Sequence, residues 1–144
     1  MKEALFRGLT TRKPCSHEFN YIWVEGDLII SDGKYYIHPR SNTVRVQGEL
    51  GKLIVMHEVI PETVGQFTGL PDRKGKKIFV GDRCRVSRPC VLAYGKITFQ
   101  NGCFWFVDDG PGGMLRLCDV KMNGFDVEVI GNIHDTLELP GGML

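Results

Sequence analysis

Seven basic residues in one short stretch are the densest group of side chains that could do chemistry in this sequence. They lie between positions 73 and 88 and are Arg73, Lys74, Lys76, Lys77, Arg83, Arg85 and Arg88. On an extended strand Arg83 and Arg85 would share one face, and Trp105 with its neighbouring phenylalanines offers rings on which bases stack. This set is typical of nucleic-acid binding. Cations also protect strand edges from aggregation, and that structural interpretation is the one we favour.

The cysteines and histidines lack the spacing of a metal site or a catalytic centre. Structural zinc sites pair their ligands as C-x2-C or H-x3-H, and this sequence contains no such pair. No nucleophile motif such as G-x-S-x-G accompanies the histidines. Cys84, Cys103 and Cys118 are interpreted as small apolar core residues, whereas the segment Cys15-x-His17 is also compatible with metal binding. We therefore predict no metal, no cofactor and no enzymatic activity.

Two adjacent carboxylates, Asp108 and Asp109, begin the glycine-rich sequence D-D-G-P-G-G. Oxygen ligands of this kind bind divalent cations, but a calcium loop has more of them at alternate positions. The glycines do not form a phosphate cradle either, because neither a P-loop lysine nor a helix follows them. A solvated turn is the favoured interpretation.

The composition is that of one globular domain. The chain has 144 residues, of which 42% are hydrophobic and 24% are charged, and this size buries a core without staples. A net charge of +1 provides no chain-wide field that would attract nucleic acid or anionic lipid. No apolar run approaches the roughly 20 residues of a membrane span. Five cysteines, an odd number, and no apolar leader predict free thiols and a cytoplasmic location.

Turn residues predict an all-β fold with many short antiparallel strands and little helix. The chain has 18 glycines and seven prolines, more than a helical protein needs. Asp32-Gly33 and Asn101-Gly102 each stand between apolar runs and predict tight hairpins. Strands are expected at residues 21–30 (a strand pair or one bent strand), 35–37, 44–46, 53–59, 83–86 (after a turn at Gly81-Asp82), 91–99, 103–107 and 125–130. Residues 114–120 fit either a strand or one helical turn, and residues 135–139 fit at most a short terminal helix.

Residues 61–77, which we call the signature segment, are predicted to form a long loop with little regular structure. Pro61 ends the preceding strand. Gly65 and Gly69 are expected to adopt positive φ or to allow close backbone approach, and Phe67, together with Val64 and Leu70, to pin the loop onto the core. The polar residues either cap the loop's own backbone groups or present a binding surface, and we favour capping. These polar residues are Glu62, Thr63, Gln66 and Thr68.

The same segment carries a resemblance to a known family. Residues 59–70 read V-I-P-E-T-V-G-Q-F-T-G-L, and Asp72, Gly75, Ile78 and Gly81-Asp82 follow at fixed spacing. With F-R-G at 6–8, W-V-E-G-D-L at 23–28 and V-E-V-I-G-N-I at 127–133, this pattern resembles the YopX family. The sequence departs from it at Val80, where the family often has glutamate, and at residues 134–136. The resemblance implies a mostly β protein of phages and prophages with no agreed activity and no established catalytic residues.

The sequence thus predicts a single YopX-like domain. It would contain N-terminal strands at 1–60, the signature segment at 61–77, a meander at 78–133 and a tail at 134–144. The architecture is expected to be a small sandwich, or an SH3-like half-barrel in the second half, where G-D-R-C-R-V resembles the strand start of such barrels. We expect a binding or structural accessory protein that self-associates or binds a phage or host protein. A nucleic-acid binder that uses the basic stretch is the alternative.

Overall fold

Strands dominate the computed structural model of this protein, which describes residues 4–11, 22–39, 43–45, 52–54 and 56–134. The chain divides into two compact units, residues 1–66 and 67–144. The boundary falls inside the signature segment. The prediction that the whole chain is one YopX-like domain stays a prediction. Within the described ranges no helix combines the length and the apolar character of a membrane span.

The first unit is an antiparallel sheet with the strand order β6-β3-β2-β1. Its strands are β1 (Phe6–Leu9), β2 (Trp23–Ser31), β3 (Lys34–His38) and β6 (His57–Val59), and a separate hairpin is formed by β4 (Thr43–Arg45) and β5 (Lys52–Ile54). The predicted turn between β2 and β3 is confirmed, since Asp32 has φ 53° and Gly33 has φ 76°. Val24, Ile37 and Val59 form the buried core of this unit.

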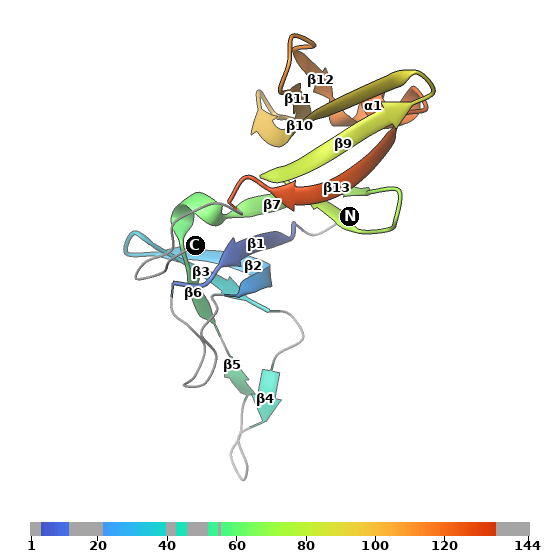
Figure 1. Cartoon of the computed structure of the whole chain (residues 1–144). Coiled ribbons are helices and arrows are strands. Elements are labelled where there is room, and N and C mark those ends of the chain that lie inside the picture. The colour runs from blue at the N-terminus through green and yellow to red at the C-terminus, as the bar shows by residue number, and fades with distance from the viewer. Residues whose placement is uncertain (1–3, 12–21, 40–42, 46–51, 55, 135–144) are drawn as a thin grey trace. The chain divides into compact units, whose positions relative to one another are not determined.

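The second unit is built on a five-stranded antiparallel sheet with the order β12-β11-β10-β9-β13, which we call the meander sheet (Figure 1). Its strands are β9 (Asp82–Arg88), β10 (Val91–Gln100), β11 (Cys103–Asp108), β12 (Met114–Arg116) and β13 (Asp126–Asn132), and helix α1 (Leu117–Met122) lies between the last two. Consecutive strands pair from β9 to β12, and β13 then returns to pair with β9. The prediction of an all-β fold with antiparallel strands and little helix is confirmed.

One face of the meander sheet is buried, as strand alternation predicts. Cys84 and Val86 of β9 point inward with Ile97, Phe106 and Val127 from the neighbouring strands. Leu117 and Val120 of α1 belong to the same core, so the helix covers this face. The Asn101-Gly102 hairpin between β10 and β11 is confirmed, with φ 51° and 74°. Residues 114–120 contain both predicted structures, the whole of strand β12 and the start of helix α1.

The prediction of an irregular loop for the signature segment is wrong. This segment contains a 3-10 helix (η1, Pro61–Thr63), strand β7 (Gly65–Pro71) and the start of β8 (Lys77–Phe79). Gly65 and Gln66 pair with β1, and Phe67 and Pro71 pair with β8. Glycine and proline content indicates where strands break, but it does not reveal partners that lie far along the chain.

The single strand predicted at 53–59 is divided between β5 and β6. Val46, the Cys15-x-His17 segment and the helix predicted at 135–139 lie outside the described residues.

Candidate functional site

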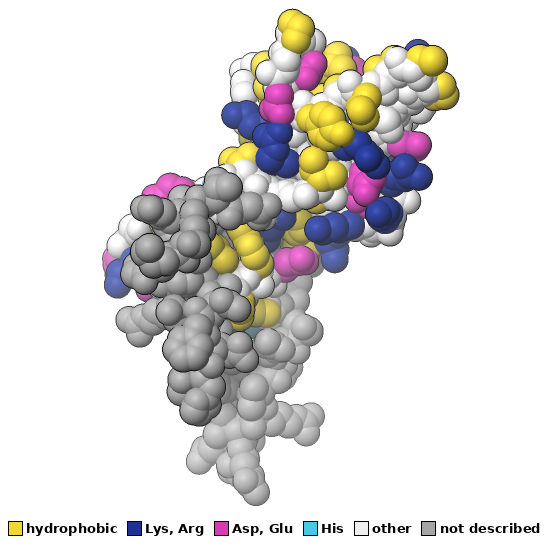
Figure 2. Space-filling model, viewed as in Figure 1, with side chains coloured by type: hydrophobic (Ala, Val, Ile, Leu, Met, Phe, Trp, Pro, Cys, Tyr) yellow, Lys and Arg dark blue, Asp and Glu magenta, His cyan; other side chains and the backbone are white. Residues whose placement is uncertain are grey.

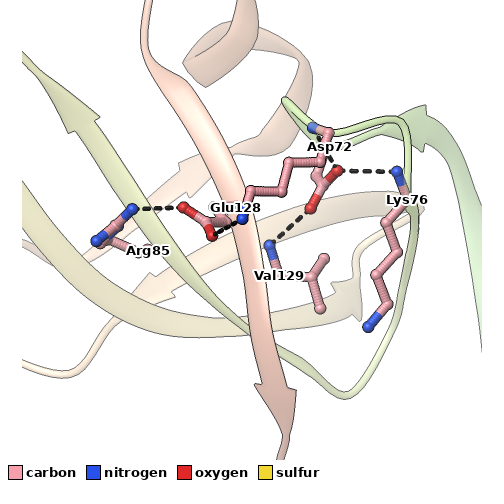
Figure 3. A network of polar contacts seen from close by, with 6 residues as sticks. Asp72, Lys76, Arg85, Glu128 and Val129 are labelled. Atoms are coloured by element: carbon pink, nitrogen blue, oxygen red, sulfur yellow. Dashed lines mark hydrogen bonds and ion pairs between the residues drawn. The ribbon is translucent and has the colours of Figure 1, made fainter.

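The buried carboxylate of Asp72 connects the signature segment to the meander sheet through hydrogen bonds (Figure 3). Asp72 Oδ1 accepts hydrogen bonds from the backbone N–H groups of Lys74 and Lys76, both at 2.8 Å. Asp72 Oδ2 accepts one from the N–H of Val129 in β13 at 3.0 Å. Gly75 completes the turn at 72–76 with φ 85°. We call residues 72–76 the signature turn.

The signature turn covers the outer edge of β13. The N–H of Arg73 donates to the carbonyl of Val127 at 2.8 Å, next to the bond that Val129 makes with Asp72. Lys121 Nζ of α1 also donates to the Pro71 carbonyl at 2.6 Å. Unpaired strand edges recruit other strands, and covering an edge with a loop prevents this. Asp72 and Gly75, two positions of the family pattern, therefore have a structural role.

The pKa of Asp72 reflects its bonding. Burial raises the pKa of this carboxyl, but the N–H groups of Val129, Lys76 and Lys74 stabilise the charged form and leave the pKa below its ordinary value. A carboxylate committed to three backbone donors is a structural group. It is therefore a poor candidate for binding a ligand or moving a proton.

Two threonines of the signature segment bond backbone groups, and the Thr68 hydroxyl accepts from the segment's own Leu70 N–H at 3.2 Å. The Thr63 hydroxyl donates to the Ile60 carbonyl at 2.6 Å and accepts from the N–H of Leu9 at 3.0 Å. The Thr68 hydroxyl donates to the Ile78 carbonyl at 2.8 Å. Of the two glycines, Gly69 has positive φ, at 86°, whereas Gly65 is buried where β7 pairs with β1.

The remaining signature residues lie on η1 and β7. Pro61 begins η1 and Glu62 is exposed beside it. Gln66 pairs with Phe6 of β1. The Phe67 ring lies 5.6 Å from the Phe79 ring, and Leu70 packs against the core of the second unit.

Thr63 provides a direct test of this structural role. Replacing it with valine keeps the side-chain shape but leaves the Leu9 N–H without its acceptor in a buried position, so Thr63→Val should destabilise the protein by about 2 kcal/mol. Urea unfolding measures this change. Thr63→Ser retains the hydroxyl and should cost clearly less. A loss in Thr63→Val no larger than that in Thr63→Ser would show that the hydrogen bonds contribute no more than the methyl group and would contradict this role.

The seven predicted cations lie on different elements, and several are held by acids. Lys74 and Arg85 both contact Glu128, Lys74 at 3.0 Å, and Arg83 pairs with Asp109. On the face in view, Figure 2 shows basic side chains of the second unit interleaved with acidic and hydrophobic ones. The pKa of Glu128 is lowered, first by its hydrogen bond with Lys74 and then by the nearby charge of Arg85, although desolvation opposes this.

The other four cations are distributed over β9, the signature turn and β8. The guanidinium of Arg88 lies 4.8 Å from the centre of the Phe125 ring and donates to the Asn123 carbonyl at 3.1 Å. Arg73 and Lys76 are exposed on the signature turn, and the exposed Lys77 begins β8. The structure therefore brings Lys74 and Arg85 together at Glu128 and spreads the rest.

A different surface, absent from the sequence interpretation, is the outward face of the meander sheet. Strand register places Tyr94 beside Arg85, Lys96 beside both Arg83 and Val107, and Trp105 beside Arg116. Leu92, Met114 and Glu128 have the same orientation by alternation. We call this surface the open face; its residues are Arg83, Arg85, Leu92, Tyr94, Lys96, Trp105, Val107, Met114, Arg116 and Glu128.

Only one of the three neighbouring aromatic residues predicted to stack bases lies on the open face. Phe106 is buried and Phe104 packs against the same core, so both point inward. Trp105 is partly exposed, and its indole N–H donates to the Gln100 carbonyl at 2.8 Å. The alternation of β11 accounts for this division.

The two adjacent carboxylates form a turn, as the favoured interpretation held. Asp108 accepts from the N–H of Gly110 at 3.0 Å and from that of Gly112 at 3.1 Å, while Asp109 pairs with Arg83. The described part of the chain contains no group of three or more His, Cys, Asp or Glu residues that could hold a metal.

The core interpretation is confirmed for Cys84 alone. Cys84 is fully buried, whereas Cys103 is half-buried. For Cys118 the prediction is wrong, because this residue lies on the exposed side of α1. Helix α1 begins at Leu117, and its turn directs Leu117 and Val120 inward and Cys118 outward.

Comparison with known proteins agrees with the family resemblance. No curated protein and no solved structure matches the chain. A family model described as YopX protein matches residues 17–139, which is most of the sequence. The structure explains several positions of the family pattern, since Thr63, Thr68, Gly69, Asp72 and Gly75 each make a turn or a cap. The chain belongs to the YopX family.

Proposed function

We propose that this YopX protein is a non-enzymatic accessory protein of a phage or prophage, acting in the host cytoplasm as an interaction module. Its binding surface would be the open face, and its direct partner a second copy of the chain. One observation carries the proposal: large side chains on that face are left in solvent. Leu92 is 61% exposed, Tyr94 43% and Met114 41%.

The composition of the open face supports a protein partner. Protein interfaces are enriched in aromatic residues, methionine and arginine, and this face combines all three types. Its arginines are oriented by acids, with Arg83 on Asp109 and Arg85 on Glu128. Side chains held in this way lose less freedom when a partner binds.

The charge on the open face favours a second copy. A two-fold contact brings the same patch together from both subunits, so the patch must complement itself. Here Arg83 pairs with Asp109 and Arg85 with Glu128, and both signs of charge are therefore present. A purely basic face would repel its own copy.

Sedimentation equilibrium tests the proposal. Wild-type protein should form dimers at sub-millimolar concentration, and the double variant Leu92→Glu, Tyr94→Glu should weaken association at least about tenfold, equivalent to 1.4 kcal/mol. Met122→Glu is the matched control, because Met122 is 83% exposed at the end of α1 and lies off the open face. A wild-type protein that stays monomeric, or equal weakening by both changes, would contradict self-association through this face.

Single-stranded nucleic acid is the second candidate, and Lys96 is the observation that favours it. This lysine lies on β10 between the rows that contain Tyr94 and Trp105, so a cation stands among rings that stack bases. Fluorescence anisotropy with labelled single-stranded DNA and RNA at low salt should then show micromolar binding that Lys96→Glu and Tyr94→Ala both reduce. No binding by the wild-type protein would eliminate this candidate.

A further inference from the structure

A hollow in the second unit has two thiols in its wall. Its volume is about 330 Å³. It is lined by Thr68, Leu70, Cys103, Phe104, Arg116, Leu117 and Cys118. Both cysteines are free thiols; Cys118 is exposed and Cys103 partly so. A disulfide reagent can therefore reach them, unlike the fully buried Cys84.

Strand register explains why both cysteines lie at the same end of the β11–β12 pair. In the β11–β12 pair, Trp105 is opposite Arg116 and Phe106 is opposite Leu115. Cys103 precedes Trp105 by two residues, and Cys118 follows Arg116 by two, so Cys118 occupies the position that would oppose Cys103 if β12 continued. Both cysteines therefore lie at the same end of the β11–β12 pair, two positions beyond its last paired residues, and both line the hollow. A disulfide joins Cα atoms roughly 4.4 to 6.8 Å apart, so bridge formation tests whether the two residues approach to that distance. Helix α1 begins at Leu117 and keeps Cys118 in the wall of the hollow.

We propose that Cys103 and Cys118 form a reactive dithiol that a small-molecule disulfide, such as oxidised glutathione, converts to an intramolecular disulfide. The more exposed Cys118 thiolate attacks one sulfur of the reagent and forms a mixed disulfide, and the first glutathione leaves as a thiolate. The Cys103 thiolate then attacks the Cys118 sulfur and expels the second glutathione. The two protons released by the cysteines end on the two glutathiones, and the reagent's disulfide is reduced as the protein's is formed.

The bridge would act on the structure around the hollow. It would tie the first turn of α1 to the beginning of β11, next to Leu117 of the second unit's core. A cross-link of this kind restricts the unfolded chain more than the folded one, so the oxidised protein should unfold at a higher temperature. The thermal stability of the protein would thus depend on the redox state of its surroundings through the bridge between β11 and α1.

Peptide mapping of the full chain tests the inference. Trypsin cuts after Lys96, Arg116 and Lys121, so Cys103 and Cys118 fall on separate peptides, 97–116 and 117–121. After incubation of the native protein with oxidised glutathione, we expect these two peptides to be joined, with a combined mass two hydrogens below the sum of the separate peptides. Cys103→Ser should instead accumulate one glutathione on Cys118, whereas the matched control Cys90→Ser, at another exposed cysteine, should still form the bridge.

Three results would overturn the inference. These are stable glutathione on Cys118 of the wild-type protein, a disulfide that involves Cys90 in place of Cys103, and no reaction at Cys118 under conditions that modify Cys90. The bridge should form at protein concentrations far below those of dimerisation. A joined peptide that appears only in covalent dimers would also contradict an intramolecular reaction.

Discussion

Asp72→Ala is expected to lower the free energy of unfolding by roughly 3 kcal/mol, because three backbone N–H groups lose a charged acceptor at once. The Asp72 side chain is buried, with 5% of the residue exposed, so water cannot fully replace the carboxylate. The signature turn would lose the bonds to Lys74 and Lys76, and the edge of β13 would lose the bond to Val129. Urea unfolding followed by tryptophan fluorescence measures the loss.

Asp72→Asn should lower the free energy of unfolding less than Asp72→Ala does, and it also tests the pH dependence of stability. Its amide oxygen can still accept from Lys74 and Lys76, but its NH2 group would face the N–H of Val129, so one interaction is lost and one repulsion gained. Since the folded-state pKa of Asp72 is depressed, its stabilisation is complete above the unfolded pKa and is lost as pH falls through the folded pKa. The difference in stability between wild type and Asp72→Asn should therefore be largest near neutral pH and shrink below about pH 4.

Asp109→Asn is the matched control for both changes. Asp109 is another aspartate of the second unit, but it is exposed and its carboxylate pairs with the Arg83 side chain. Exposed ion pairs contribute little, so this variant should lose less than about 1 kcal/mol. If Asp72→Ala and Asp109→Asn lose the same amount, the signature turn does not secure the edge of β13.

Local chemistry made the hairpins predictable. Asp32-Gly33 and Asn101-Gly102 adopt positive φ at both positions, which few residue pairs tolerate, so two letters of sequence were enough. The signature segment was mispredicted because its order depends on distant partners. Thr63 bonds Leu9, which is 54 residues away, and Asp72 bonds Val129, which is 57 residues away.

The sequence predicted which residue types the candidate site contains, but not the surface on which they lie. The sequence showed the density of cations, but their neutralising acids are remote, with Glu128 43 residues after Arg85 and Asp109 26 after Arg83. The open face was not predicted because it combines residues of different strands. Leu92, Tyr94 and Lys96 lie on one side of β10, and only the register with β9 shows that Tyr94 is beside Arg85 and Lys96 beside Arg83. Period-two alternation within β10 was the available signal.

Gly95→Ala should be the most damaging single methyl addition in the second unit, with a loss of about 3 kcal/mol or a failure to fold. Gly95 is buried in β10, where an added Cβ would lie 2.1 Å from the Val107 carbonyl oxygen and 2.9 Å from the Phe106 ring. The ring could shift only by disturbing the core that it fills. The carbonyl belongs to the β10–β11 ladder and could move only by breaking it.

Gly110→Ala is the matched control for that substitution. Gly110 lies in the turn after β11, and a Cβ there would meet its nearest neighbour, the Asp108 carboxylate, at 3.8 Å, an ordinary contact distance. This variant should stay within about 0.5 kcal/mol of wild type. Soluble yield and urea unfolding compare the two variants directly. If Gly95→Ala is tolerated as well as Gly110→Ala, then β10 does not approach β11 as closely as the packing of Phe106 over Gly95 requires, and the register that forms the open face must be different.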